Sequence, residues 1–174
     1  MRIAGRGLID RETPVSFTFD GRRYGGFAGD TVASAMLANG QRLMGRSFKY
    51  HRPRGVLSAG SEEPNALVTT GVGPASEPNV RATMQEIYEG LQVRSQNAWP
   101  SLDLDLMAVN DLASPFLGAG FYYKTFMWPR NFWRRVYEPV IRRAAGLGRL
   151  SRQPNADAYE KAYAFCDLLV IGAG

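Results

Sequence analysis

The chain has 174 residues and a formal net charge of +5 at pH 7; 45% of its residues are hydrophobic and 21% are charged. These proportions are typical of a soluble globular protein and exclude an intrinsically disordered chain. The single cysteine, Cys166, cannot build a disulfide framework or a cysteine metal site, and we expect it to be a small residue of the core.

The sequence also limits the compartment and the partners. No apolar run reaches the roughly 20 residues that span a membrane, and no secretory signal follows the N-terminus. We therefore expect a cytoplasmic protein without a membrane partner. The positive charge gathers in residues 46–54 and 130–152, which carry no nucleic-acid-binding signature, so we expect no nucleic-acid partner. The arginines at helical spacing in the second cluster predict a solvated helix face; they are Arg130, Arg134, Arg135, Arg142 and Arg143.

The first predicted unit is a β-hairpin followed by a helix. Residues 15–19 alternate apolar and polar side chains, and Asp20-Gly21 is typical of the two-residue turn that joins hairpin strands. The returning strand is expected at residues 22–27. A helix should follow, with Asp30 as its N-cap and Asn39-Gly40 as its stop signal. A hairpin followed by a packed helix is the start of a ferredoxin-like β-grasp domain.

Loops and short strands are expected in the rest of this domain, which we end at residue 99. Residues 45–55 combine positive charge and aromatic side chains with Pro53 and Gly55, which favours a loop. A second loop follows at residues 56–65. The predicted strands are 66–70, 80–83 and 92–95.

The next segment, residues 100–158, is predicted to connect two domains. Asp103 and Asp105 lie two residues apart and cannot share a helix face, so we interpret them as a solvated loop or a helix start and not as an acid–base pair. Residues 116–129 are dense in aromatic side chains, which must be buried against another domain or a partner subunit. A helix is expected at residues 131–146.

Residues 159–174 have the pattern that begins a dinucleotide-binding fold. The four apolar residues 168–171 are typical of a parallel strand that is buried on both faces. Gly172, Ala173 and Gly174 then match the start of a G-x-G-x-x-G fingerprint, in which glycines permit a tight turn and a close approach to a pyrophosphate. The alternative is an ordinary strand end. Because the third glycine and the phosphate-binding helix would lie further on, we expect the chain to be the front part of a longer protein.

Three strings of the sequence resemble the alpha subunits of heterotetrameric sarcosine oxidases. They are GRSFKYHRPRG at 45–55, GFYYKTFMWP at 120–129 and CDLLVIGAG at 166–174. Related amine and amino-acid dehydrogenase subunits share the opening domain, a ferredoxin-like module that holds a 2Fe–2S cluster. The resemblance implies an α+β fold with three parts: a ferredoxin-like β-grasp domain at 1–99, a connecting segment at 100–158, and the first strand of a truncated Rossmann-type α/β domain at 159–174.

The resemblance also locates the cluster ligands of those relatives. Four cysteines hold the cluster, three on one loop and one farther along the chain. The matching positions here are Ser58, Glu63, Ala66 and Thr83. A 2Fe–2S cluster needs soft thiolate ligands, and none of these side chains supplies a thiolate. We therefore expect the ferredoxin fold without an iron–sulfur cluster or other metal.

The resemblance implies a flavin oxidase that converts sarcosine, oxygen and water into glycine, formaldehyde and hydrogen peroxide. When tetrahydrofolate is bound in the C-terminal half, the one-carbon unit becomes methylenetetrahydrofolate. The beta subunit handles sarcosine at an FAD and holds an FMN at its interface with alpha, and gamma and delta complete the heterotetramer. The alpha subunit binds NAD, whose site would begin at Gly172, Ala173 and Gly174. No residue of this chain matches a catalytic role, so it is expected to be inactive alone.

One loop and two other functions stay open. Lys49, His51 and Arg52 could face an anion, such as a flavin phosphate or an acidic partner surface; the alternative is a loop held by its own hydrogen bonds. The chain could also belong to another amine, opine or amino-acid dehydrogenase, whose substrate site would lie in another subunit. A β-grasp interaction module without a redox role is the third possibility.

Overall fold

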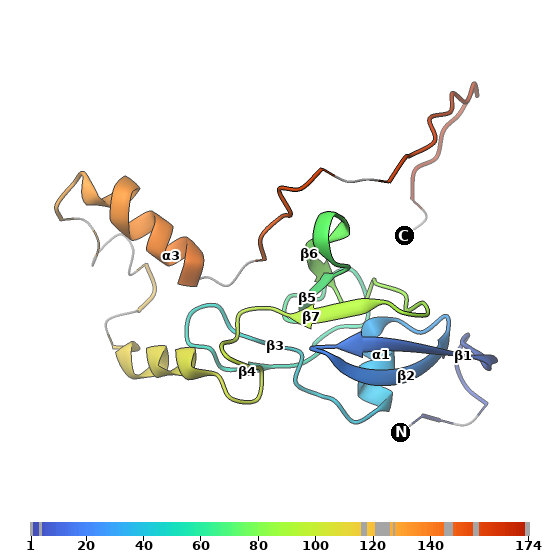
Figure 1. Cartoon of the computed structure of the whole chain (residues 1–174), viewed down its shortest axis with the longest axis horizontal. Helices are drawn as coiled ribbons and strands as arrows, with labels where there is room; N and C mark the ends of the chain where they lie inside the picture. Colours follow the sequence, from blue (N-terminus) through green and yellow to red (C-terminus); the bar gives the residue numbers. More distant parts are fainter. Residues whose placement is uncertain are drawn as a thin grey trace.

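The computed structural model of the chain describes residues 2–3, 5–115, 118–120, 126, 128–144, 148–154 and 157–172. A five-stranded mixed sheet and one helix, α1, form the α+β domain that occupies the first hundred or so residues (Figure 1). The strand order in this sheet is β2-β1-β7-β5-β6. The predicted α+β fold of this part is confirmed.

The sheet begins with the predicted hairpin. β1 (Asp10–Phe19) and β2 (Arg22–Ala28) pair antiparallel. The turn residues Asp20 and Gly21 have φ angles of 49° and 79°. Asp-Gly suits this turn because glycine adopts a left-handed conformation without steric cost and aspartate tolerates it better than most residues. The hairpin and its turn are therefore confirmed.

The other strands place a parallel pair in the middle of the sheet. β7 (Gln92–Ser95) runs parallel to β1 and antiparallel to β5 (Leu67–Thr70), and β5 pairs antiparallel with β6 (Glu77–Arg81). The strands predicted at 66–70 and 92–95 are confirmed, and the one predicted at 80–83 begins three residues earlier. Inside the predicted loop, two short strands form a separate ribbon; they are β3 (Gly45–Arg46) and β4 (Pro53–Arg54).

Helix α1 (Val32–Ala38) starts one residue later than predicted. Its N-cap is Thr31, whose Oγ1 accepts a hydrogen bond from the Ser34 amide, while the Thr31 amide donates to Ser34 Oγ. This reciprocal pair is a capping box. Threonine and aspartate are both good N-caps, so the sequence alone did not separate Thr31 from Asp30. The predicted stop at Asn39-Gly40 is confirmed.

Asp30 instead fixes the N-terminal segment to the helix. Its two carboxylate oxygens accept hydrogen bonds from the Arg2 guanidinium at 2.8 and 2.5 Å, and the Arg2 side chain also lies over the Phe27 ring. Burial raises the pKa of the Asp30 carboxyl, but hydrogen bonds from Arg2, Ser34 and the Phe27 amide lower it by more. The pKa of the Asp30 carboxyl therefore lies below its ordinary value, and the group is ionised at neutral pH.

The core of the domain is apolar and contains side chains from the sheet, from α1 and from the loops that follow. Phe17, Val32, Met36, Val68 and Val93 are fully buried members. The remaining buried apolar residues are Phe19, Tyr24, Ala33, Ala35, Met44, Ala66, Ala82, Ile87, Leu91 and Leu102. Apolar burial of this kind is the dominant favourable contribution to the folding of such a domain.

The described part of the chain beyond residue 105 contains three helical elements. They are the 3₁₀ helix η2 (Leu106–Ala113), the π-helix η3 (Trp133–Tyr137) and α3 (Glu138–Ala144). The last two together form the predicted helix at 131–146, which stands apart from the sheet in Figure 1. No helix in the described ranges is both long and apolar enough to cross a bilayer.

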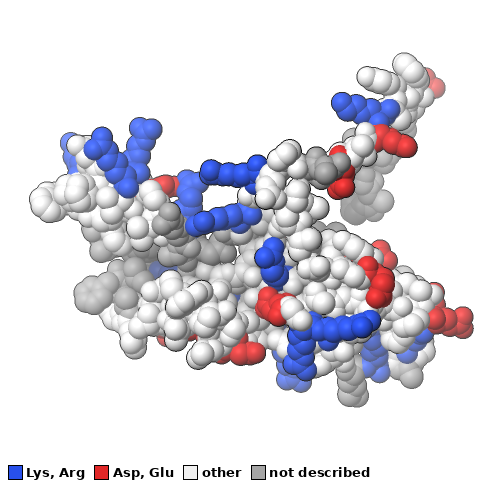
Figure 2. Space-filling model, viewed as in Figure 1, with Lys and Arg blue, Asp and Glu red and all other residues white. Residues whose placement is uncertain are grey.

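The basic face predicted for this helix is exposed. Lys and Arg side chains gather over the end of the molecule occupied by η3 and α3 (Figure 2). The described arginines here are in contact with solvent, and Arg142 also binds Glu138 one helical turn away. The interpretation of Arg130, Arg134, Arg135 and Arg142 as a solvated face is therefore confirmed, and the side chain of Arg143 lies outside the described part of the structure.

The predicted strand at residues 168–171 is not formed. Residues 157–172 run without helix or strand, and the apolar side chains of 168–171 are exposed. A strand needs hydrogen-bonding neighbours, and no described residue pairs with this segment. Cys166 is also exposed, so its predicted place in the core is wrong. The dinucleotide-binding domain itself stays a prediction, as do the boundaries at residues 99 and 158.

Candidate functional site

The four positions that the resemblance assigns to cluster ligands converge in the structure. Ser58, Glu63 and Ala66 belong to the loop at residues 55–66, which joins β4 to β5 and is called here the cluster loop. Thr83 lies just after β6, and its Oγ1 donates a hydrogen bond to the Gly60 carbonyl at 2.8 Å. The fourth position is thereby attached to the loop that carries the other three.

The Glu63 carboxylate lies at the centre of this loop with 1% of the residue exposed. Its Oε2 accepts hydrogen bonds from the amides of Leu57 and Ser58, each at 2.7 Å. Its Oε1 accepts from the amides of Asn65 and Ala66 at 2.8 and 3.0 Å. Four backbone N–H groups from both ends of the loop therefore meet at one carboxylate.

These contacts determine the ionisation of Glu63. Burial raises the pKa of the carboxyl because it penalises the charged form. The four amide hydrogen bonds lower the pKa by more, so the pKa of Glu63 lies below its ordinary value of 4.5. The loop therefore holds one buried negative charge at neutral pH.

The second candidate, the loop with Lys49, His51 and Arg52, does not gather its side chains at one point. Lys49 Nζ donates to the Gly118 carbonyl at 3.2 Å, and Arg52 pairs with Asp111 at 3.0 Å. Both cations also lie over the Tyr50 ring. These contacts agree with the alternative of a loop held by its own interactions, and anion binding by Lys49 and Arg52 stays a prediction.

His51 is buried and forms a pair with a residue that the sequence did not single out as its partner. Its Nδ1 lies 2.7 Å from Asp105 Oδ2, and 2% of the residue is exposed. Asp105 Oδ1 accepts hydrogen bonds from the amides of Trp99 and Met107. Through the bond from the Met107 amide, Asp105 is the N-cap of η2. The sequence predicted either a solvated loop or a helix start for Asp105. The second is confirmed, since Asp105 caps η2 and is buried. His51 Nε2 is buried and has no hydrogen-bond partner among the described residues.

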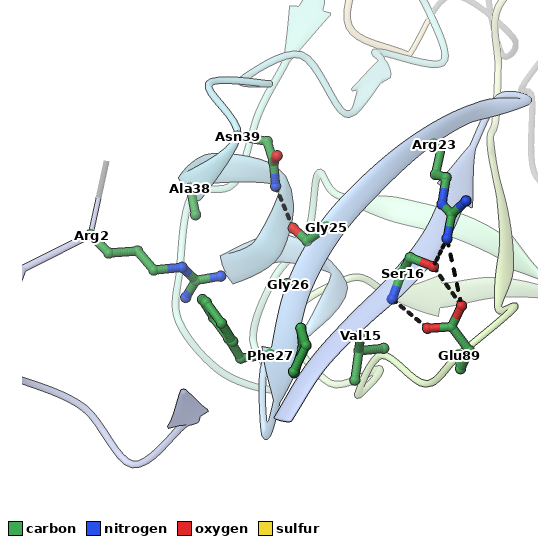
Figure 3. A pocket seen from close by; sticks show the side chains of 11 residues that line it. Arg2, Val15, Ser16, Arg23, Gly25, Gly26, Phe27, Ala38, Asn39 and Glu89 are labelled. Atoms are coloured by element: carbon green, nitrogen blue, oxygen red, sulfur yellow. Dashed lines mark hydrogen bonds and ion pairs between the residues drawn. The ribbon is translucent and has the colours of Figure 1, made fainter. Parts of the chain in front are cut away.

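An open groove of about 750 Å³ lies beside β1, β2 and α1 (Figure 3). No residue of the cluster loop lines it. Its two arginines already have acidic partners: Arg2 binds Asp30, and Arg23 lies 3.9 Å from Glu89. The groove therefore offers an anionic ligand no unpaired arginine.

Comparison with known sequences assigns this domain to a protein family. Residues 12–98, half of the chain, match the family described as 2Fe-2S iron-sulfur cluster binding domain. The chain belongs to this family. The sheet, α1 and the cluster loop all lie within the matched residues or overlap them.

Two curated relatives confirm the resemblance found in the sequence. Sarcosine oxidase subunit alpha of Rhizobium meliloti (strain 1021) is 69% identical over 173 residues, which are 99% of this chain and 18% of that protein. Sarcosine oxidase subunit alpha of Corynebacterium sp. (strain U-96) is 48% identical over 86 residues, 48% of this chain and 9% of that protein. The chain therefore spans less than a fifth of the length of these relatives.

One solved structure is similar to this chain at a lower sequence identity. L-proline dehydrogenase from P. horikoshii matches 53% of this chain and 17% of its own chain, with 21% sequence identity and a TM-score of 0.39.

The residues at the cluster loop do not fit the 2Fe–2S cluster that the family name implies. Ala66 has no ligand atom, and Thr83 Oγ1 is hydrogen-bonded to Gly60. Both oxygens of Glu63 are occupied by amide donors. The single cysteine of the sequence, Cys166, lies outside the matched domain. In the described ranges no three His, Cys, Asp or Glu side chains are arranged to hold a metal ion.

Truncation of Asp105 should destabilise the domain. Asp105→Ala removes the partner of His51 Nδ1 and the acceptor of two backbone amides, so we expect the free energy of unfolding to fall by roughly 3 kcal/mol. Asp103→Ala is the matched control because Asp103 is exposed, and its effect should stay within about 0.5 kcal/mol. Urea unfolding measures both; equal stabilities of the two variants would contradict the role of Asp105.

Glu63 should make stability depend on pH. A carboxyl with a depressed folded-state pKa contributes stability above its unfolded pKa and loses it as the pH falls through the folded pKa. At neutral pH, Glu63→Gln should lower the free energy of unfolding by about 1–3 kcal/mol, because the NH₂ group of the glutamine would face backbone N–H donors. The difference between wild type and this variant should shrink below pH 4.5. Urea unfolding across pH measures it, and a difference independent of pH would contradict the ionised buried carboxylate.

Proposed function

We propose that the chain is the N-terminal part of the alpha subunit of a multi-subunit flavin oxidase that demethylates sarcosine oxidatively. The reaction takes sarcosine, oxygen and water to glycine, formaldehyde and hydrogen peroxide. The observation that supports this proposal is the 69% identity, over 99% of this chain, to a protein named sarcosine oxidase subunit alpha. At this identity over 173 residues, the same role in a similar complex is the simplest expectation.

In this proposal the chain acts as scaffold and interface, without a catalytic residue. The His51–Asp105 pair is buried, so neither side chain reaches a substrate at the surface of this domain. Sarcosine is oxidised at FAD on the beta subunit, and oxygen is reduced at FMN on the face that beta shares with alpha. Of Lys49, His51 and Arg52, the side chains of Lys49 and Arg52 are at least partly exposed to solvent. In this proposal these two cations would face an anionic surface of the partner. Gamma and delta subunits complete the heterotetramer.

The proposal assigns the remaining cofactors to parts of the longer subunit. NAD binding would begin at Gly172, whose φ of 88° lies in the left-handed region that the turn of a dinucleotide fingerprint favours. Ala173 and Gly174 lie outside the described residues. Tetrahydrofolate would bind in the C-terminal half, where it accepts the one-carbon unit as methylenetetrahydrofolate. We place the complex in the cytoplasm.

The test is made on the complete complex. The full reading frame is expressed together with its neighbouring frames, and the purified complex should contain FAD, FMN and NAD and produce hydrogen peroxide when sarcosine is added. Glycine, the product amine, is the control and should produce no peroxide. A flavin complex that oxidises another amine or an opine but not sarcosine would contradict the substrate. A chain that purifies without flavin subunits would support a β-grasp interaction module instead.

A further inference from the structure

The cluster loop contains a charge whose position needs an explanation. Burial of a carboxylate costs free energy unless hydrogen bonds replace the lost water. In the described part of the chain, no lysine or arginine lies within ion-pair distance of Glu63. Its partners are instead four backbone amides, at residues 57, 58, 65 and 66, and the Ser58 hydroxyl, which donates to Oε2 at 3.5 Å.

Backbone amides that converge on one point form an anion-binding nest. Such nests hold phosphates and iron–sulfur clusters, whose sulfur atoms accept amide hydrogen bonds. In this loop two of the four donors belong to Ser58 and Ala66, and the acceptor belongs to Glu63. These are three of the four positions that correspond to cluster ligands, and the fourth, Thr83, binds the loop at Gly60.

We propose that the Glu63 carboxylate replaces the 2Fe–2S cluster as the anion that organises this loop. The side chain fills the amide nest from inside the chain, so the loop keeps its shape without iron. A carboxylate, unlike a 2Fe–2S cluster, does not accept or release electrons at biological potentials. The charge and the surface of the loop therefore stay the same when other parts of a complex are oxidised or reduced. This inference rests on family membership and on the contacts of Glu63, and it does not depend on which amine the complex oxidises.

Two other roles for Glu63 fit the contacts less well. It caps no helix, because the loop from Gly55 to Ala66 contains none. It is also a poor metal ligand here, because each oxygen already accepts two amide hydrogens. Among the described residues, Glu63 belongs to no group of three or more His, Cys, Asp or Glu side chains that could hold a metal ion.

The test combines removal of the anion with its replacement from solution. Glu63→Ala in the 174-residue chain leaves the four amide donors facing an empty space of carboxylate size. Amide hydrogen exchange at residues 57, 58, 65 and 66 should become roughly 10- to 100-fold faster, as expected for the loss of charge-assisted hydrogen bonds. A titration with sodium formate should restore slow exchange, because formate brings two oxygens to the same nest.

The matched control is Glu62→Ala, which removes the exposed neighbouring carboxylate. Its four loop amides should exchange at the wild-type rate with or without formate. If Glu63→Ala folds, unchanged amide exchange in it, or faster exchange that formate does not slow, would overturn the proposal.

A second variant covers the case in which Glu63→Ala does not fold. If formate then restores the far-ultraviolet circular dichroism of the folded chain, the proposal is supported. If it does not, Glu63→Gln decides, since it preserves the shape and removes the charge. Wild-type exchange in a folded Glu63→Gln would overturn the proposal, whereas its failure to fold beside a normal Glu62→Ala would support it.

Discussion

A carboxylate withdrawn from water stays ionised only where other donors replace the lost solvent. Glu63 meets this condition through the amides at both ends of the cluster loop, and the loop depends on Glu63 in return. Without an acceptor, four backbone N–H groups would be left unsatisfied at one point, at a cost of about 1–3 kcal/mol each. The two ends of this loop are therefore joined through that single charge.

The rest of the domain is held by other forces, which is why a family fold persists without the family's metal ligands. Phe17, Met36 and Val93 fill an apolar core between sheet and helix, and this core includes one former ligand position, Ala66, as an ordinary apolar member. Loss of a cluster therefore leaves one loop to be reorganised and not a whole fold. Fold and chemistry are separable in this way because function resides in a site that the fold carries.

Local signals made part of this structure predictable. Asp20-Gly21 and Asn39-Gly40 identify a turn and a helix end, because Asp20, Gly21 and Gly40 have positive φ angles, which few residues other than glycine adopt. The absence of thiolates at the ligand positions was also readable from the sequence. What takes their place was not, because the Glu63 contacts need both ends of the loop in space. The His51–Asp105 pair spans 54 residues and has no local signal. The apolar residues 168–171 have the composition of a strand, but a strand also needs a neighbour.

In this domain the Glu63 carboxylate takes the place that the cluster has in the cluster-bearing relatives. Reconstitution of the wild-type 174-residue chain with ferrous iron, sulfide and thiol under anaerobic conditions tests it most directly. We expect no visible absorption from a cluster, no electron paramagnetic resonance signal after reduction, and unchanged amide resonances for residues 57, 58, 65 and 66. A bound 2Fe–2S cluster, with shifted resonances at these four amides, would contradict it.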